Sequence, residues 1–184
     1  MKLDDDDFAL FGVERRQRQD RAALDARWRA LQAEVHPDRF AAAGAAAQRA
    51  AMQWSVRVNE AYQRLKDPLR RAAYLCELRG APVGAEVNTA MPADFLLRQM
   101  AWREALDEAS TAADVRVLAA AVAAERAALF DALERTLDRE AADDDRAAGD
   151  AASANAAAAA QVRALMFVER FRDDVERRLE AFEG

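Results

Sequence analysis

The stretch that decides the fold of the first half is residues 20–40, DRAALDARWRALQAEVHPDRF. Its large apolar residues recur at steps of three and four, the spacing of one helical face, and they are Leu24, Trp28, Leu31 and Val35. Asp20 stands at the N-cap position of that helix. Proline disfavours helical backbone at the residue before it, so the helix should end at His36. We predict a helix that begins after Asp20 and ends at the triplet His36-Pro37-Asp38.

A second helical pattern follows the triplet. After Arg39, Phe40 and a run of alanines, one face of a helix would carry Ala51, Ser55, Val58, Tyr62 and Leu65. Two stripes that face each other predict a helical hairpin, with the triplet in an exposed loop between its helices. A third helix should have Asp67 as its N-cap and Pro68 as its first residue, and Gly80 should stop it. We therefore predict a first domain over residues 1–80 and a linker over residues 81–92.

The triplet contains the only histidine of the chain. One reading is ordinary turn chemistry, in which Pro37 sets the turn and Asp38 bonds its own backbone. Catalysis would need partners for His36 that the sequence does not show, and the six glycines form no phosphate-binding loop. One cysteine excludes an internal disulfide, and one histidine excludes the usual zinc sites built from several histidines. We expect a protein that is not an enzyme and holds no metal and no cofactor, with Cys76 as a buried structural thiol.

The triplet between two matched helices resembles the J-domain co-chaperones, and further motifs narrow the resemblance to the HscB (Hsc20) family. These motifs are FALFG at residues 8–12, HPDRF at 36–40, VNEAYQRL at 58–65 and DPLRRAAYL at 67–75. The resemblance implies that His36, Pro37 and Asp38 stimulate ATP hydrolysis by a DnaK-type chaperone of the HscA kind. It also implies that the protein serves iron-sulfur cluster assembly.

Basic residues around the triplet fit an acidic partner. The resemblance to J-domains implies that basic residues near the triplet meet the chaperone's acidic nucleotide-binding domain. Arg27, Arg29 and Arg39 stand in that neighbourhood, with Arg27 as the best candidate. Asp25 and Glu34 share the first helix, so a solvated face of mixed charge is the alternative reading. The net charge is −6, with basic residues in excess over the first 80 residues and acidic residues in excess beyond them. This balance suits a protein partner better than nucleic acid.

The second half predicts a three-helix bundle over residues 93–184. Its helices run from about Ala93 to Ala109, from Asp114 to about Arg139 and from about Gln161 to Phe182. Steps of three, four and seven between their apolar residues favour antiparallel helices that face one another. Residues 140–160 are rich in Ala, Asp, Gly and Ser, and we predict a mobile loop or frayed helix ends there. The fold class is therefore all-α, with an N-terminal J-domain hairpin and a C-terminal bundle.

The first bundle helix carries more large apolar groups than one face can hide. The run FLLRQMAWREALDE at residues 95–108 resembles the HscB helix that binds the iron-sulfur scaffold protein IscU. That resemblance implies scaffold contacts at Leu96, Leu97, Met100, Glu104 and Glu108, with Phe167 added from the last helix. Ala101 stands where the family has a carboxylate. Plain core packing is the alternative for each apolar member of this set.

No apolar run approaches the roughly 20 residues of a membrane span, and the start of the chain lacks the basic and apolar regions of a signal peptide. We interpret the four aspartates at residues 4–7 as a solvated tail. We expect a protein of the bacterial cytoplasm that contacts no membrane.

The resemblance implies a co-chaperone that binds an IscU-like scaffold and presents it to an HscA-like chaperone. One alternative is a general J-domain co-chaperone that delivers unfolded clients. A second is a purely structural helical adaptor, which would stimulate no chaperone.

Overall fold

The computed structural model describes residues 4–84, 91, 93–141 and 148–183. These residues form helices and no strand, which confirms the all-α prediction. The chain divides into two compact units, Met1–Leu75 and Cys76–Gly184. In chain order the helices are α1 Asp7–Phe11, α2 Arg21–Val35, the 3₁₀ helix η1 Pro37–Ala43, α3 Ala45–Lys66, α4 Pro68–Leu78, α5 Ala93–Glu108, α6 Ala112–Ala141 and α7 Ala148–Glu183.

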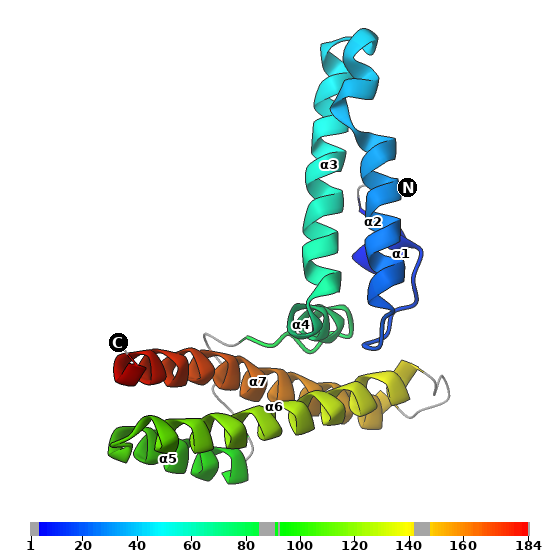
Figure 1. Ribbon diagram of the computed structural model, residues 1–184. Helices are drawn as coiled ribbons and strands as arrows, with labels where there is room; N and C mark the ends of the chain where they lie inside the picture. The colour runs from blue at the N-terminus through cyan, green and yellow to red at the C-terminus, as the bar shows by residue number, and fades with distance from the viewer. Residues whose placement is uncertain (1–3, 85–90, 92, 142–147, 184) are drawn as a thin grey trace. The chain divides into compact units, whose positions relative to one another are not determined.

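The first unit is built on a hairpin in which α2 and α3 lie side by side (Figure 1). Asp20 begins α2 as predicted, because its carboxylate accepts hydrogen bonds from the N–H groups of Ala22 and Ala23. Trp28 stacks on Tyr62 of α3 with ring centroids 4.8 Å apart. The predicted stripes are otherwise buried at Leu24, Leu31, Val35, Ala51, Val58, Tyr62 and Leu65, while Ser55 is partly exposed. The helical-hairpin prediction is confirmed.

Ion pairs hold the short helix α1 against α3. Asp7 is fully buried, and its carboxylate pairs with Arg57 at 2.7 Å and with Arg64 at 2.8 Å. A buried carboxylate needs such partners to offset the loss of hydration. Phe8 stacks on the ring of Tyr74, with centroids 5.9 Å apart. The prediction of a solvated acidic tail is therefore wrong for Asp7, which is part of the core of the first unit.

Asp67 bounds α4 at its start, as predicted. Its carboxylate accepts hydrogen bonds from the N–H groups of Leu69 and Arg70 at 2.9 and 2.8 Å. Gly80 follows the end of α4 with φ +74°, a left-handed conformation that favours glycine, and its N–H donates to the carbonyl of Glu77 at 3.0 Å. Both local signals in the sequence therefore act at the predicted positions.

The division between the two units falls inside α4, before the predicted boundary after Gly80. Arg79 lies within the second unit, where its guanidinium donates to the carbonyl of Leu137 in α6 at 2.9 Å. Residues 76–80 therefore belong to the second compact unit, and the domain boundary after Gly80 stays a prediction. Of the predicted linker, residues 81–84 are non-helical, and residues 85–90 and 92 lie outside the described residues.

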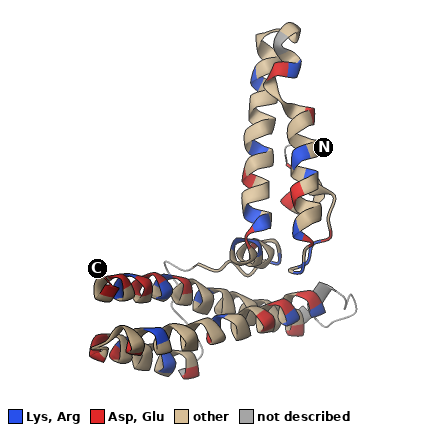
Figure 2. Cartoon of the chain, viewed as in Figure 1, with Lys and Arg blue, Asp and Glu red and all other residues tan. Residues whose placement is uncertain are grey.

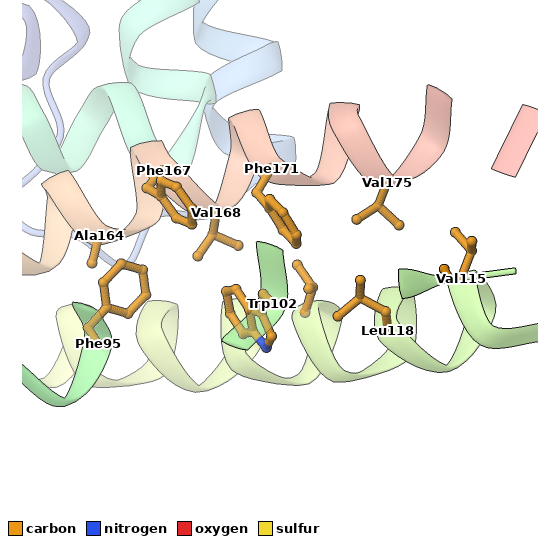
Figure 3. Close-up of a cluster of buried hydrophobic side chains, with 11 residues drawn as sticks. Phe95, Trp102, Val115, Leu118, Ala164, Phe167, Val168, Phe171 and Val175 are labelled. Carbon is orange, nitrogen blue, oxygen red and sulfur yellow. The ribbon is translucent and has the colours of Figure 1, made fainter. Parts of the chain in front are cut away.

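The second unit is a bundle of α5, α6 and α7 around one apolar core (Figures 1 and 3). The ring of Trp102 from α5 stacks on Phe171 of α7 with centroids 5.8 Å apart, and Phe95 meets Trp102 edge-on at 6.3 Å. Such aromatic pairs stabilise a core beyond the area they bury. The cluster is completed from α6 and α7, with Val115, Leu118, Val122, Ala164, Phe167, Val168 and Val175 among its members. The predicted three-helix bundle is confirmed.

The predicted loop over residues 140–160 is wrong for most of its length. α6 continues to Ala141, and α7 already begins at Ala148. Alanine has the highest helix propensity, so the composition that suggested a loop instead extends a helix. Ala158 and Ala159 are buried, and their small side chains let α7 pack closely on its neighbours. The remaining residues of the prediction, 142–147, lie outside the described residues.

Candidate functional site

The His36-Pro37-Asp38 triplet joins α2 to η1. His36 has extended backbone (φ −61°, ψ 128°) and is at once the C-cap of α2 and the N-cap of η1. Pro37 is the first residue of η1, a position that suits proline because no backbone donor is needed there. The sequence predicts an exposed loop for the triplet. The structure places it in the first turn of a 3₁₀ helix instead, with His36 and Asp38 exposed.

The hydrogen bonds of this turn leave one carboxylate available. The N–H of Asp38 donates to Nδ1 of His36 at 3.3 Å, and the N–H of Arg39 donates to the carbonyl of His36 at 3.0 Å. The Asp38 carboxylate lies 3.6 Å from Nδ1, and its side chain is 91% exposed. In ordinary turn chemistry the aspartate side chain would bond the backbone. Here the histidine side chain does so, and the aspartate is presented to solvent.

Two of the three predicted arginines are engaged within the first unit. Arg27 donates through Nε to the carbonyl of Phe11 at 3.3 Å. Arg39 donates to the carbonyls of Ala33 and Glu34 at 3.1 and 3.5 Å. These carbonyls are in the last turn of α2, where no N–H group of the helix is available to them. All three guanidinium-bearing residues remain exposed to solvent.

α2 carries both basic and acidic residues (Figure 2), and Arg29 lies one turn after Asp25 on this helix. Asp25, one turn earlier, accepts hydrogen bonds from the Tyr62 hydroxyl at 2.8 Å and from Arg21 at 2.7 Å. The Tyr62 bond first, and then Arg21, hold the pKa of Asp25 below its ordinary value. Arg29 adds a smaller Coulombic contribution in the same direction.

An apolar surface lies on the side of α5 that faces away from the core. We call it the outer face of α5 and define it by Leu96, Leu97, Met100, Glu104 and Glu108. Leu97 is 69% exposed and Met100 is 67% exposed, whereas Phe95 and Trp102 on the opposite side of the helix are buried. Leu96 is also exposed, and Glu104 and Glu108 continue the same stripe toward the end of α5. The structure thus brings five of the six predicted scaffold contacts together.

Phe167 does not belong to this surface. It is 7% exposed and is a member of the core cluster (Figure 3). Its ring meets Phe95 edge-on and stacks on Phe171, both with centroids 5.8 Å apart, and the Arg103 guanidinium lies 5.5 Å from its centroid. Phe167 therefore has a core role in this structure, because its neighbours already cover it, and its contact with a scaffold stays a prediction.

Two features of the structure lie outside the sequence predictions. Arg98 of α5 pairs with Glu125 of α6, a contact between distant positions that sequence spacing does not reveal. Met52 and Val56 are exposed on α3, on a different side of the helix from its buried stripe. The register of that stripe predicts an outward position for both, so this signal was present in the sequence.

Within the described ranges, no group of three or more His, Cys, Asp or Glu side chains is arranged to hold a metal ion. Among the helices of those ranges, none combines the length and the apolar character that crossing a bilayer requires.

The chain is similar to proteins of known family. Residues 91–176 match the family described as HSCB C-terminal oligomerisation domain. A protein of Burkholderia multivorans named co-chaperone protein HscB homolog is 46% identical, with the match covering 100% of this chain and 99% of that protein. A protein of Paraburkholderia xenovorans with the same name is also 46% identical, covering 99% and 98%.

Solved structures give the same result. Chaperone HscB from Vibrio cholerae matches with a TM-score of 0.74 and 32% identity, covering 97% of this chain and 99% of that one. Human co-chaperone protein HscB matches with a TM-score of 0.76 and 25% identity, covering 98% and 83%. These findings agree with the resemblance predicted from the motifs between residues 8 and 75.

Proposed function

Because the chain belongs to the HscB family of co-chaperones, we propose that it serves iron-sulfur cluster assembly by presenting a scaffold protein to a DnaK-type chaperone. The proposed partners are an IscU-like scaffold and an HscA-like chaperone, and the proposed compartment is the bacterial cytoplasm. In this role the protein catalyses nothing itself. It changes the rate at which the chaperone hydrolyses ATP and brings it a particular client.

The chaperone contact is proposed at the triplet. The turn is held by the bond from the Asp38 N–H to His36, so the backbone that carries the exposed Asp38 carboxylate is already ordered before binding. Arg27 and Arg29 lie on the helix that leads to this turn, where they would attract an acidic surface and speed association. Docking of the carboxylate would then favour the hydrolysis-competent state of the ATP-bound chaperone.

The scaffold contact is proposed at the outer face of α5, and this surface is the observation that carries the proposal. Leu97 and Met100 are large apolar side chains held in water on a helix that already has a buried side. Exposed apolar groups rimmed by carboxylates are typical of a protein-binding surface. A general J-domain co-chaperone for unfolded clients, the second candidate, has no need of such a rigid helical surface.

The two contacts together would make the protein a bivalent adaptor. Holding the scaffold on the same chain as the triplet raises the effective concentration of client at the chaperone. Hydrolysis would convert the chaperone to its tight-binding state with the scaffold loaded.

Steady-state ATP hydrolysis by an HscA-type chaperone tests the proposal. We expect this protein to stimulate hydrolysis and the scaffold to raise the stimulation further. Stimulation that is indifferent to the scaffold would instead favour the general co-chaperone. No stimulation would mean that the triplet is only a turn.

A further inference from the structure

Large apolar residues lie on more than one side of α5, so their pattern alone does not decide which side turns to the core. Phe95 and Trp102 point inward, while Leu97 and Met100 point outward. The outward residues would also gain free energy if they were buried. A helix rotated about its own axis is therefore a competing arrangement, and in that arrangement the outer face of α5 would be lost to a partner.

Arg98 lies on the flank between these two sides and reaches across to α6. Its guanidinium donates a hydrogen bond to the carboxylate of Glu125, whose side chain is only 19% exposed. Asp94, one turn earlier on α5, lies 3.7 Å from the same guanidinium. Charge-assisted hydrogen bonds are directional, so this one forms at one rotation of α5 and is broken at others. A rotated α5 would leave the partly buried Glu125 without its cation.

A second contact holds the end of α5 in a different way. Arg178 of α7 donates to the carbonyl of Ala109, just after α5, at 2.9 Å. This bond anchors the residue that follows α5, but a contact to a terminal carbonyl does little to set the rotation of the helix. The Arg98–Glu125 pair is on the side of the helix and constrains rotation directly.

We propose that the Arg98–Glu125 ion pair is the positioning interaction that keeps the outer face of α5 turned toward its scaffold partner, an inference that rests on the proposed function. Neither residue is a member of that face. The pair acts by lowering the population of rotated α5. The apparent dissociation constant for the scaffold is inversely proportional to the fraction of binding-competent molecules. The pair favours one rotation of α5 more than it raises the free energy of unfolding.

Reversing the two charges tests the proposal. The affinity of each variant for the IscU-like scaffold is measured by isothermal titration calorimetry. Arg98→Glu and Glu125→Arg should each weaken binding by about tenfold, and the double variant should recover most of the affinity. The same exchange at Arg116 and Glu183, an exposed pair that joins α6 to α7, is the matched control and should leave affinity unchanged. Glu125→Gln is the milder variant if either reversal lowers the helix content.

Hydrogen exchange of the α5 amides gives a readout that needs no scaffold. Exchange should rise in each single variant and return toward the wild-type rate in the double variant. The proposal is overturned if α5 exchange is the same in all forms. It is also overturned if Arg98→Glu weakens binding while Glu125→Arg does not, since that result would mean direct contact. Failure of the wild-type protein to bind scaffold would overturn the proposed function, while α5 exchange would still decide the role of the pair.

Discussion

The backbone N–H of Asp38 donates to Nδ1 of His36 across 3.3 Å, so the histidine holds the turn on which the aspartate carboxylate is displayed. The two residues therefore have different physical roles within one triplet. His36 acts on the backbone of the turn. Asp38, whose side chain is 91% exposed, is left to act on another molecule.

Asp38→Asn should abolish stimulation of the chaperone's ATPase. The substitution removes a negative charge but keeps the size of the side chain and the backbone bond to His36. The measurement is steady-state ATP hydrolysis at saturating co-chaperone, with scaffold affinity determined in parallel. Scaffold affinity should not change, and Asp173→Asn, at an exposed position of α7, should change neither quantity. A joint loss of stimulation and scaffold binding would contradict two independent sites.

Arg29→Ala and Arg39→Ala should have different effects, because only Arg39 caps α2. Loss of the bonds from Arg39 to the carbonyls of Ala33 and Glu34 should lower the free energy of unfolding by about 1 kcal/mol in urea titrations. Arg29→Ala should leave stability within about 0.5 kcal/mol of wild type. It should instead raise the concentration needed for half-maximal ATPase stimulation, most strongly at low salt. Equal stability of the two variants would remove the capping role from Arg39.

Leu97→Ala together with Met100→Ala should weaken scaffold binding by at least about tenfold, since apolar centres carry most of the energy of such interfaces. Stability should hardly change, because both side chains already stand in water. Met52→Ala is the matched control: this methionine is 61% exposed on α3, outside the outer face of α5. If the double variant unfolds, these residues have a packing role that their exposure does not suggest.

Phe167→Ala should act on stability. Removing a buried ring that packs on Phe95 and Phe171 should lower the free energy of unfolding by about 3–5 kcal/mol. Phe167→Leu keeps most of the volume and should cost less. Calorimetric melting of both variants, with scaffold affinity measured well below the transition, separates the two roles. A scaffold-affinity loss in a Phe167→Leu protein of normal stability would return this residue to the partner surface.

The helix ends could be predicted from the sequence because their causes are local. Asp20, Pro37, Asp67 and Gly80 each act on backbone groups within about one turn, so a short window contains the whole physical argument. The hairpin could be predicted for a related reason, since spacing alone determines which residues share a face.

Contacts between distant residues could not be predicted in this way. Arg98 and Glu125 are on different helices, and nothing in either local sequence indicates the partner. Phe167 lies on a stretch of α7 that is buried on several sides, so its spacing does not separate a core role from a surface role. Composition was misleading at residues 148–160, where alanine extends α7.

Acid should destabilise the first unit through Asp25. Its carboxylate accepts hydrogen bonds from the Tyr62 hydroxyl and from Arg21, which hold its pKa below the ordinary value of 3.8. A carboxyl whose pKa is lower in the folded state contributes stability above the unfolded-state pKa, and this contribution is lost as the pH falls through the folded-state value. Asp25→Asn should therefore melt at a lower temperature than wild type near pH 7, and the difference should shrink below about pH 4. Circular dichroism melts between pH 2 and pH 7 measure this, with Asp173→Asn as the control for loss of one carboxyl. A difference in melting temperature that stays constant across this range would show that the Tyr62 and Arg21 bonds do not favour the ionised form of Asp25.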